Sequence, residues 1–340
     1  MKTLHLKTLP NVREKNIAQA AKLIRAGKLV AFPTETVYGL GANVFDEHAI
    51  KEIFRVKGRP QDNPLIVHLH SLTQLHRLVK SVPLKFWLLA EHFMPGPLTI
   101  LLNKSDLVSM TVTAGLSTVA IRMPSHNVAR ALLRKASVPI VAPSANLSGR
   151  PSPTRAEHVA EDLDGSIAAI LDGGACDVGV ESTVIDIAKK TPVILRPGAV
   201  TKEQLEAVLK TTVRVSRPQK VRPASPGMKY AHYAPKAEVI SFEGEAANVV
   251  KAMTRMMRLR NVKHRVGVMA EHDWAKRFDA AVFFSLGRSP EEAAQRLFNG
   301  FRTLDKSGVE TILCQGFEAK EIGRAYMNRL RTAATRRIRV

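Results

Sequence analysis

The chain of 340 residues contains little cysteine and few aromatic side chains. Its two cysteines, Cys176 and Cys314, lie far apart, which excludes a disulfide framework and a cysteine zinc site. Aromatic residues make up 5% of the chain, which disfavours a surface that stacks single-stranded bases. No apolar run reaches membrane-spanning length, and the first residues lack the apolar core of a signal peptide. We therefore expect a cytosolic protein without membrane contact.

Positive charge is what the chain has in excess. It carries 51 lysines and arginines against 30 acidic residues, a formal net charge of +21. Such an excess favours polyanionic partners, which include nucleic acids and phosphorylated substrates. A basic surface without a specific partner is the plain alternative.

The order of apolar and polar segments predicts two α/β domains joined by a linker. Strands and helices alternate over residues 1–210 and again over residues 238–340, where the pattern is that of a small parallel, Rossmann-like sheet. Residues 211–237 contain four prolines and six basic residues but no acid. That composition is typical of an extended linker.

The segment 32–69 predicts a binding crevice. One strand ends before a polar turn that contains Thr36, and a second strand carries His68 close to its end. Between them, the sequence KGRP places Lys57 and Arg59 on either side of a glycine, in a loop stiff enough to direct two cations at phosphate oxygens.

Other predicted strands of the first domain also end in polar or cationic residues: Arg122, Ser144, Asn146, Ser182, Thr183 and Arg196. A single such residue is usually a turn or cap residue, but several together indicate a shared crevice at one edge of the sheet.

Two histidines, His68 and His70, are too few for a zinc site, so we expect no protein-bound metal. The chain has no Walker A motif and no nucleophile elbow, and its Gly39-Leu40-Gly41 lacks the third glycine of a dinucleotide fingerprint.

Seven motifs carry a resemblance to a known family: PTETVYGLGA, KGRP with NPLIVH, PGPLTILL, AIRMP, APSANLSG, ESTVID and LRPG. In this order they resemble the YrdC-like threonylcarbamoyl-adenylate synthases. SPGMKYAHYAP, followed by a second α/β domain, resembles the long two-domain form. The resemblance implies a YrdC-like catalytic domain with a twisted mixed sheet over 1–210, a linker over 211–237 that acts as a lid, and a small Rossmann-like domain over 238–340.

The reaction implied by the resemblance joins L-threonine, bicarbonate or CO2, and ATP into threonylcarbamoyl-AMP, with release of pyrophosphate. Other proteins then use the product to modify a tRNA adenosine. Mg²⁺ is expected to be carried with the nucleotide. A carbamate oxygen is already an anion, so it needs alignment, charge neutralisation and exclusion of water rather than an enzymatic nucleophile.

Motif positions imply the following roles. Threonine or its carbamate would be held by Thr36, His68, Arg122, the backbone of Ala142, and Ser182. ATP would be held by Arg59, Asn63, Thr118, Ser144, Ser152, Arg196 and, from the linker, Tyr233. Lys57 and Arg59 would be the catalytic pair, as stabilisers of phosphate charge rather than as an acid or base.

Two other interpretations stay open at this point. The chain could be an RNA-binding module without catalysis, with phosphates tracked by a basic carboxy-terminal helix and tail that contain Arg329, Arg331, Arg336, Arg337 and Arg339. Carbamoyl transfer in a maturation enzyme is less favoured, because such enzymes need further domains and cysteine-rich zinc motifs. Direct binding of tRNA is compatible with the charge.

Overall fold

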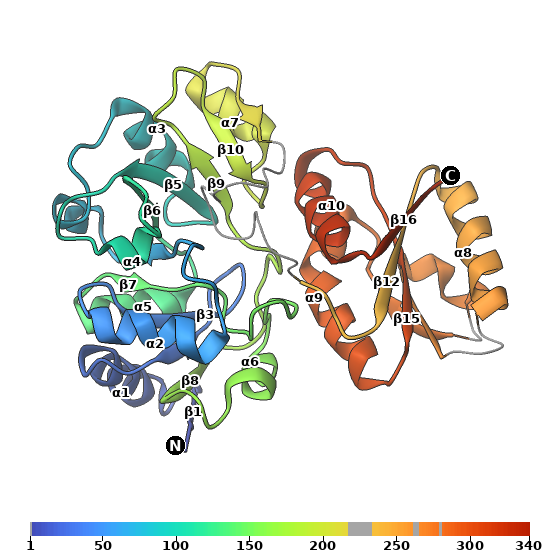
Figure 1. Ribbon diagram of the computed structural model, residues 1–340, viewed down its shortest axis with the longest axis horizontal. Coiled ribbons are helices and arrows are strands. Elements are labelled where there is room, and N and C mark those ends of the chain that lie inside the picture. Colours follow the sequence, from blue (N-terminus) through green and yellow to red (C-terminus); the bar gives the residue numbers. More distant parts are fainter. Residues whose placement is uncertain (1, 217–232, 261–264, 279–280) are drawn as a thin grey trace. The chain divides into compact units, whose positions relative to one another are not determined.

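The computed structural model describes residues 2–216, 233–260, 265–278 and 281–340 (Figure 1). The chain divides into two compact units. The first comprises Met1–Ser148, Ser152–Asp177 and Glu181–Tyr230, and the second comprises Gly149–Pro151, Val178–Val180 and Ala231–Val340. Among the described residues, no helix is long and apolar enough to cross a membrane.

The described part of the first unit is built on an eleven-stranded sheet with the order β1-β8-β2-β3-β7-β4-β6-β5-β9-β10-β11. The strands are β1 (Leu4–Lys7), β2 (Val30–Phe32), β3 (Gly39–Asn43), β4 (Ile66–His68), β5 (Leu98–Asn103), β6 (Thr118–Arg122), β7 (Ile140–Val141), β8 (Ala169–Asp172), β9 (Thr183–Asp186), β10 (Val193–Arg196) and β11 (Arg214–Val215). β4 runs parallel to β6, whereas β7 is antiparallel to β4 and β5 is antiparallel to β6. The predicted mixed sheet is confirmed.

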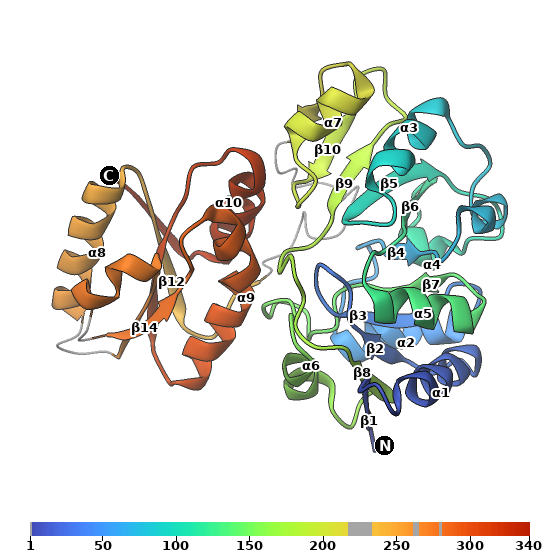
Figure 2. The same cartoon turned by 180° about the vertical axis from the view of Figure 1, so that it is seen from behind.

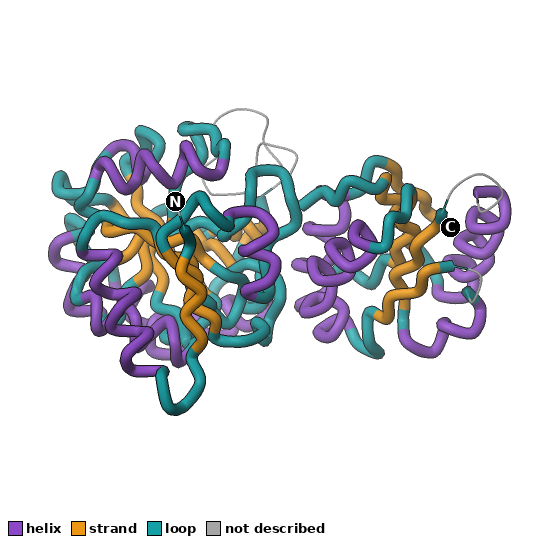
Figure 3. The backbone as a smooth tube through the Cα atoms, turned by 90° about the horizontal axis from the view of Figure 1, so that it is seen from below, coloured by secondary structure: helices purple, strands orange, loops and turns teal. Residues whose placement is uncertain are grey.

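Helices cover the sheet of the first unit, and Figure 3 shows its strands as an inner layer. They are α1 (Arg13–Arg25), α2 (Glu47–Lys57), the 3-10 helix η1 (Leu72–Arg77), α3 (Leu84–Phe93), α4 (Met110–Thr113), α5 (Asn127–Ala136), α6 (Ala156–Leu163) and α7 (Lys202–Leu209). The short central strands β4 and β7 are buried throughout, which explains why they read as continuous apolar runs. Polar side chains are therefore expected at the ends of β4 and β7 rather than inside them.

The second unit contains a five-stranded sheet with the order β14-β13-β15-β12-β16, in which every pair is parallel. Its elements are β12 (Glu238–Glu243), α8 (Ala246–Arg260), β13 (Val266–Ala270), the 3-10 helix η2 (His272–Arg277), β14 (Val282–Ser285), α9 (Pro290–Lys306), β15 (Thr311–Gln315), α10 (Glu321–Ala333) and β16 (Arg336–Arg339). Figures 1 and 2 both show α8 on one face of this sheet and the packed pair α9 and α10 on the other. The predicted Rossmann-like architecture is confirmed.

The prediction of a basic carboxy-terminal tail is wrong. Residues 336–339 form β16, an edge strand in parallel register with β12. Arginines on an edge strand discourage pairing with further strands, and their abundance hides the strand pattern in the sequence. Arg329 is fully buried in α10, and Arg331 pairs with Glu243 at 2.7 Å, so neither is free to follow a phosphate chain.

The first residues of the predicted linker belong to the first sheet. Val213 is buried, and Arg214–Val215 form β11, which pairs in parallel with β10. The predicted lid over residues 217–232, including Tyr230 and His232, lies outside the described residues.

Candidate active site

Arg122, the last residue of β6, faces a buried carboxylate. Its Nη2 donates to Oε1 of Glu35 at 2.7 Å, and only 5% and 7% of the two side chains are exposed. The other carboxylate oxygen of Glu35 accepts from the backbone N–H of Ser125 at 3.2 Å. Nε of Arg122 is buried and has no hydrogen-bond partner within the described part of the chain. An unpaired buried N–H is costly, so this atom is suited to a ligand oxygen.

His68 ends β4 and lies opposite Arg122 in the parallel register of β4 and β6. Burial, together with the charge of Arg122, lowers the pKa of His68 to about 3. The imidazole is therefore neutral at physiological pH and acts through hydrogen bonds rather than as a cation. Its Nδ1 lies 3.2 Å from the carbonyl oxygen of Ile66.

Thr36 lies in the turn beside Glu35 and is fully buried. The hydroxyl of Thr34 donates to the carbonyl of Val37 at 2.7 Å, and the hydroxyls of Thr34 and Thr36 are 2.8 Å apart. The single hydroxyl proton of Thr34 is used in the bond to Val37, so Thr36 must be the donor between the two hydroxyls. The hydroxyl oxygen of Thr36 can still accept a hydrogen bond from a ligand, for example from an amine or a hydroxyl.

Arg196 and Ser182 are joined directly. Arg196, the last residue of β10, donates from Nε to the carbonyl of Ser182 and from Nη2 to its hydroxyl, both at 3.1 Å. The same hydroxyl lies 2.8 Å from Oγ1 of Thr99 on β5. We call Arg122, Glu35, His68, Ser182, Arg196 and Thr99 the Arg122 cluster. The strand registers place Thr99 and His68 level with Arg122.

Gly198 leaves no room for a side chain beside this cluster. A Cβ there would lie 2.2 Å from the backbone nitrogen of Thr183 and 2.5 Å from the carbonyl carbon of Ser182. Backbone cannot move aside as a flexible side chain does, so the glycine allows this close approach.

Gly198→Ala is expected to lower the free energy of unfolding by about 1–3 kcal/mol, the usual cost of overpacking. The variant should also displace Ser182, to which the motif resemblance gives a role in holding threonine, and so lower the affinity for threonine. Urea unfolding measures the first effect and calorimetric titration the second. If the alanine variant has an unchanged unfolding midpoint and an unchanged threonine affinity, the backbone of residues 181–183 can shift to accommodate the added methyl group without loss of stability or binding.

Lys57 forms the core of a second group of residues. Asp46 caps the start of α2 by accepting from the N–H of Ala49 at 3.0 Å, and Gly58, with φ of 58°, ends the helix. Lys57 is therefore the last helical residue, and only 2% of it is exposed. Its ammonium donates to the carbonyl of Ser144 at 2.6 Å and to the carbonyl of Asn146.

Arg59 shapes the loop that follows α2. Its Nε donates to the carbonyl of Asn63 at 3.2 Å, and its Nη2 donates to the carbonyl of Pro64 at 2.9 Å. The side-chain Oδ1 of Asn63 is buried and, among the residues that the structure describes, has no hydrogen-bond partner. We call Lys57, Arg59, Asn63, Ser144 and Asn146 the Lys57 cluster.

The two clusters lie at opposite ends of the central strands. β4 begins after Asn63 and ends at His68, and the antiparallel β7 leads toward Ser144 at the end where β4 begins. Thr118, the first residue of β6, is four residues from Arg122, about 13 Å along the strand. The turn before β3 contacts both groups, because Glu35 bonds Arg122 and the carbonyl of Tyr38 accepts from the N–H of Ala145, next to Ser144. One shared crevice stays a prediction.

The remaining predicted residues are placed as follows. The hydroxyl of Ser152 donates to Glu181 at 2.5 Å, beside Ser182 in the sequence. The N–H of Ala142 bonds to Ile66, which leaves its carbonyl as the backbone group for a ligand. Tyr233 belongs to the second unit, where its ring centroid is 5.1 Å from that of Phe298.

Carboxylates of the first unit offer no ready metal site. Within the described ranges, no group of three or more His, Cys, Asp or Glu residues could hold a metal ion. Glu35 is engaged by Arg122 and Ser125, and Glu181 by Ser152. The donor set therefore does not fit a resident Mg²⁺ held by protein carboxylates.

Comparison with known proteins matches both units. Residues 22–198 match the family model of Sua5, YciO and YrdC proteins described as "Telomere recombination". Residues 200–335 match the model described as "Threonylcarbamoyl-AMP synthase, C-terminal domain". The chain belongs to the two-domain threonylcarbamoyl-AMP synthase family. The resemblance seen in the motifs is thus confirmed, and with it the prediction of a nucleotidyltransferase-type enzyme.

Individual relatives cover nearly the whole chain. Threonylcarbamoyl-AMP synthase of Pyrococcus abyssi is 48% identical over 96% of this chain and 98% of its own length. The Bacillus subtilis protein of that name is 47% identical over 96% of this chain and 95% of its own. A crystal structure of P. abyssi Sua5 with L-threonine superposes with a TM-score of 0.94 at 46% identity and covers 100% of both chains.

Glu35 and Thr99 are the members of the Arg122 cluster to which the sequence analysis gave no role. Glu35 had a usable signal, because a carboxylate directly after a buried strand needs a cationic partner. Thr99 had none, since it lies inside the apolar run LTILL and resembles an ordinary strand residue.

Proposed function

We propose that the chain forms L-threonylcarbamoyl-AMP and pyrophosphate from L-threonine, bicarbonate or CO2, and ATP. The observation that carries the proposal is the buried Nε of Arg122, which has no hydrogen-bond partner among the described residues and lies beside neutral His68, in a chain of this family. The guanidinium of Arg122 bonds Glu35 through Nη2, and its Nε can donate to a ligand. This arrangement matches a carboxylate such as that of threonine.

The separation of the clusters fits the shape of this product. Threonylcarbamoyl-AMP has an amino-acid carboxylate at one end and a nucleotide at the other. We assign threonine and its carbamate to Thr36, His68, Arg122, Ser182 and the carbonyl of Ala142. The ATP phosphates are assigned to the Lys57 cluster, with Thr118 at the same end of β6. Ser152, Arg196 and Tyr233 are the other proposed nucleotide contacts.

The chemistry needs no protein nucleophile. The threonine amine and bicarbonate give a carbamate and water, and the carbamate oxygen attacks the α-phosphorus of ATP. The new oxygen–phosphorus bond replaces the one to pyrophosphate, which leaves. The cations Lys57 and Arg59 would stabilise the charge of the phosphates, and Mg²⁺ carried with the nucleotide would neutralise the departing pyrophosphate.

The wider setting belongs to the same proposal. The product would pass, in the cytoplasm, to proteins that modify tRNA. RNA binding without catalysis is the second candidate function, favoured by the net charge of +21.

The test is to incubate the pure chain with ATP, threonine and bicarbonate and to measure both pyrophosphate and threonylcarbamoyl-AMP. We expect equal amounts of the two, and neither when any one substrate is omitted. Pyrophosphate that forms without threonine would indicate another nucleotide reaction. A chain that produces neither compound with all substrates present would favour the RNA-binding candidate.

A further inference from the structure

The second unit carries a hollow that the proposed reaction does not use. It encloses about 500 Å³ between α8 and the end of η2. Lys251, Arg255 and Arg258 line it from α8, and Arg277 lines it from η2. The other lining residues are uncharged, and no described residue that lines the hollow is acidic. We call this hollow the α8 basic groove.

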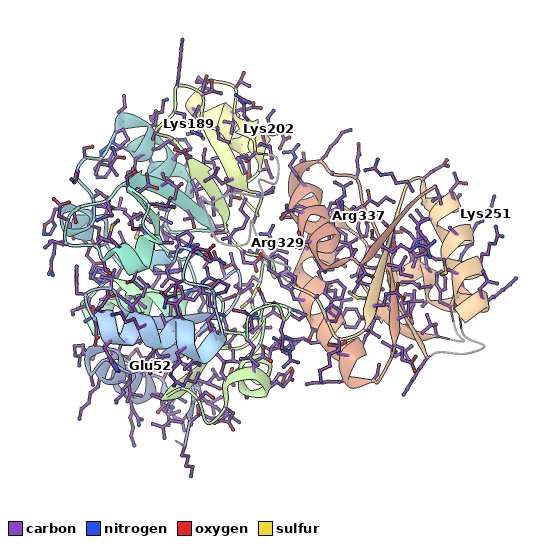
Figure 4. All side chains as sticks on the ribbon, viewed as in Figure 1. Glu52, Lys189, Lys202, Lys251, Arg329 and Arg337 are labelled. Atoms are coloured by element: carbon purple, nitrogen blue, oxygen red, sulfur yellow. The ribbon has the colours of Figure 1, made fainter. Side chains whose placement is uncertain are left out.

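The cations of the α8 basic groove lie on one helical face. Lys251, Arg255 and Arg258 follow one another at intervals of four and three residues, which places them in a row along α8. All three are exposed, as is Arg277. Figure 4 shows Lys251 on the side of α8 that points away from the sheet.

These cations are not neutralised by neighbouring acids. None of the four forms an ion pair or side-chain hydrogen bond with any residue in the described ranges. Other basic residues of the same unit are paired: Arg331 with Glu243 at 2.7 Å, Arg288 with Asp273 at 3.4 Å, and Lys320 with Glu318 at 2.6 Å. As far as the described residues show, the groove is a local concentration of positive charge without acidic partners.

We propose that the α8 basic groove binds the sugar–phosphate backbone of RNA. Three of its four cations are arginines, whose planar fork matches phosphate oxygens. None of the described residues that line the groove is aromatic, so we expect contacts to the backbone rather than stacked bases, and binding that is independent of sequence. The choice of RNA over other nucleic acids rests on the proposed function, whose product serves tRNA modification.

A membrane surface fits the groove less well. Stable membrane attachment requires an apolar or lipid anchor in addition to basic residues. Leu259, 66% exposed, is the one large apolar side chain exposed among the described lining residues. A hollow also suits a strand of phosphates better than it suits a flat surface.

The test measures binding of an unmodified tRNA transcript to the full-length chain by fluorescence anisotropy between 50 and 200 mM salt, a range in which phosphate contacts weaken strongly. The groove variant combines Arg255→Glu and Arg258→Glu. The control variant combines Arg288→Glu and Lys320→Glu, which are exposed in the same unit, change the net charge equally, and normally pair with acids. Circular dichroism checks that both variants are folded.

We expect the groove variant to bind tRNA about tenfold more weakly and to reduce the slope of log K against log salt by about 1–2. The control should change much less. Equal losses in both variants would mean that only net charge matters, and unchanged binding in the groove variant would exclude the groove; either result overturns the proposal. Binding of phosphatidylserine vesicles that is lost in the groove variant, with tRNA binding intact, would assign the groove to lipid instead.

The same variants separate this proposal from the proposed function. Threonylcarbamoyl-AMP formation should be unchanged in the groove variant, because none of its residues belongs to the Arg122 or Lys57 cluster. A chain that binds tRNA through the groove but makes no product would refute the proposed function alone. A chain that makes product but does not bind tRNA would refute the groove alone.

Discussion

Replacing Lys57 with methionine is expected to slow pyrophosphate release by about 100-fold or more, the usual cost of removing a group that stabilises transition-state charge. Methionine keeps most of the length and the apolar stem but loses the ammonium. That ammonium is buried and donates to the carbonyls of Ser144 and Asn146. The variant thus removes a positive charge and leaves two carbonyls without their donor.

Lys51→Met is the matched control for this experiment. Lys51 lies on the same helix, but its side chain is 64% exposed and only approaches Glu47 at 3.7 Å. An exposed ion pair of this kind contributes little, so the control should retain nearly full activity and stability. Steady-state rates at saturating and limiting ATP separate a loss of turnover from a loss of ATP binding. Near-normal pyrophosphate release by Lys57→Met would exclude the charge-stabilising role.

The sequence predicted the fold well because the relevant signals are local. In the structure Asp46, a residue type that favours helix starts, is the N-cap of α2, and Gly58 is its left-handed C-cap. The short buried strands around β4 and β7 read as apolar runs bounded by polar residues. The strand β16 was missed because its four residues, RRIR, carry the charge pattern of a solvated tail.

The arrangement of the candidate site was harder to predict. Strand direction decides which strand ends lie next to each other. In a mixed sheet, that direction depends on pairings between strands that are far apart in the sequence. β4 and β6 are parallel, whereas β7 runs antiparallel to β4. Arg122 therefore lies at one end of these neighbouring strands and Ser144 lies beyond the other end. The glycines Gly39 and Gly41 likewise lie within β3, where a Cβ on Gly41 would be 2.8 Å from the ring of Phe32. Their role is close packing rather than phosphate binding.

Arg122→Lys is expected to weaken threonine binding about 100-fold and ATP binding hardly at all. Arg122 uses Nη2 for Glu35 and keeps the buried Nε for a ligand. A lysine ammonium is a single point charge, so it cannot hold Glu35 and grip a carboxylate from two directions. Loss of a charge-assisted hydrogen bond costs about 1.5–3 kcal/mol, which corresponds to a 10- to 150-fold change in affinity.

Calorimetric titration of threonine and ATP into each variant measures this selectivity. Arg134→Lys, at an exposed position on α5, is the control and should bind both ligands normally. Glu35→Gln adds a test of positioning, because it keeps the size of the side chain but weakens its hold on the guanidinium. We expect Glu35→Gln to lower threonine affinity while ATP affinity is retained. Unchanged threonine affinity in Arg122→Lys would mean that the open Nε serves another ligand, and an equal loss of ATP binding would mean that Arg122 supports the nucleotide end of the strands instead.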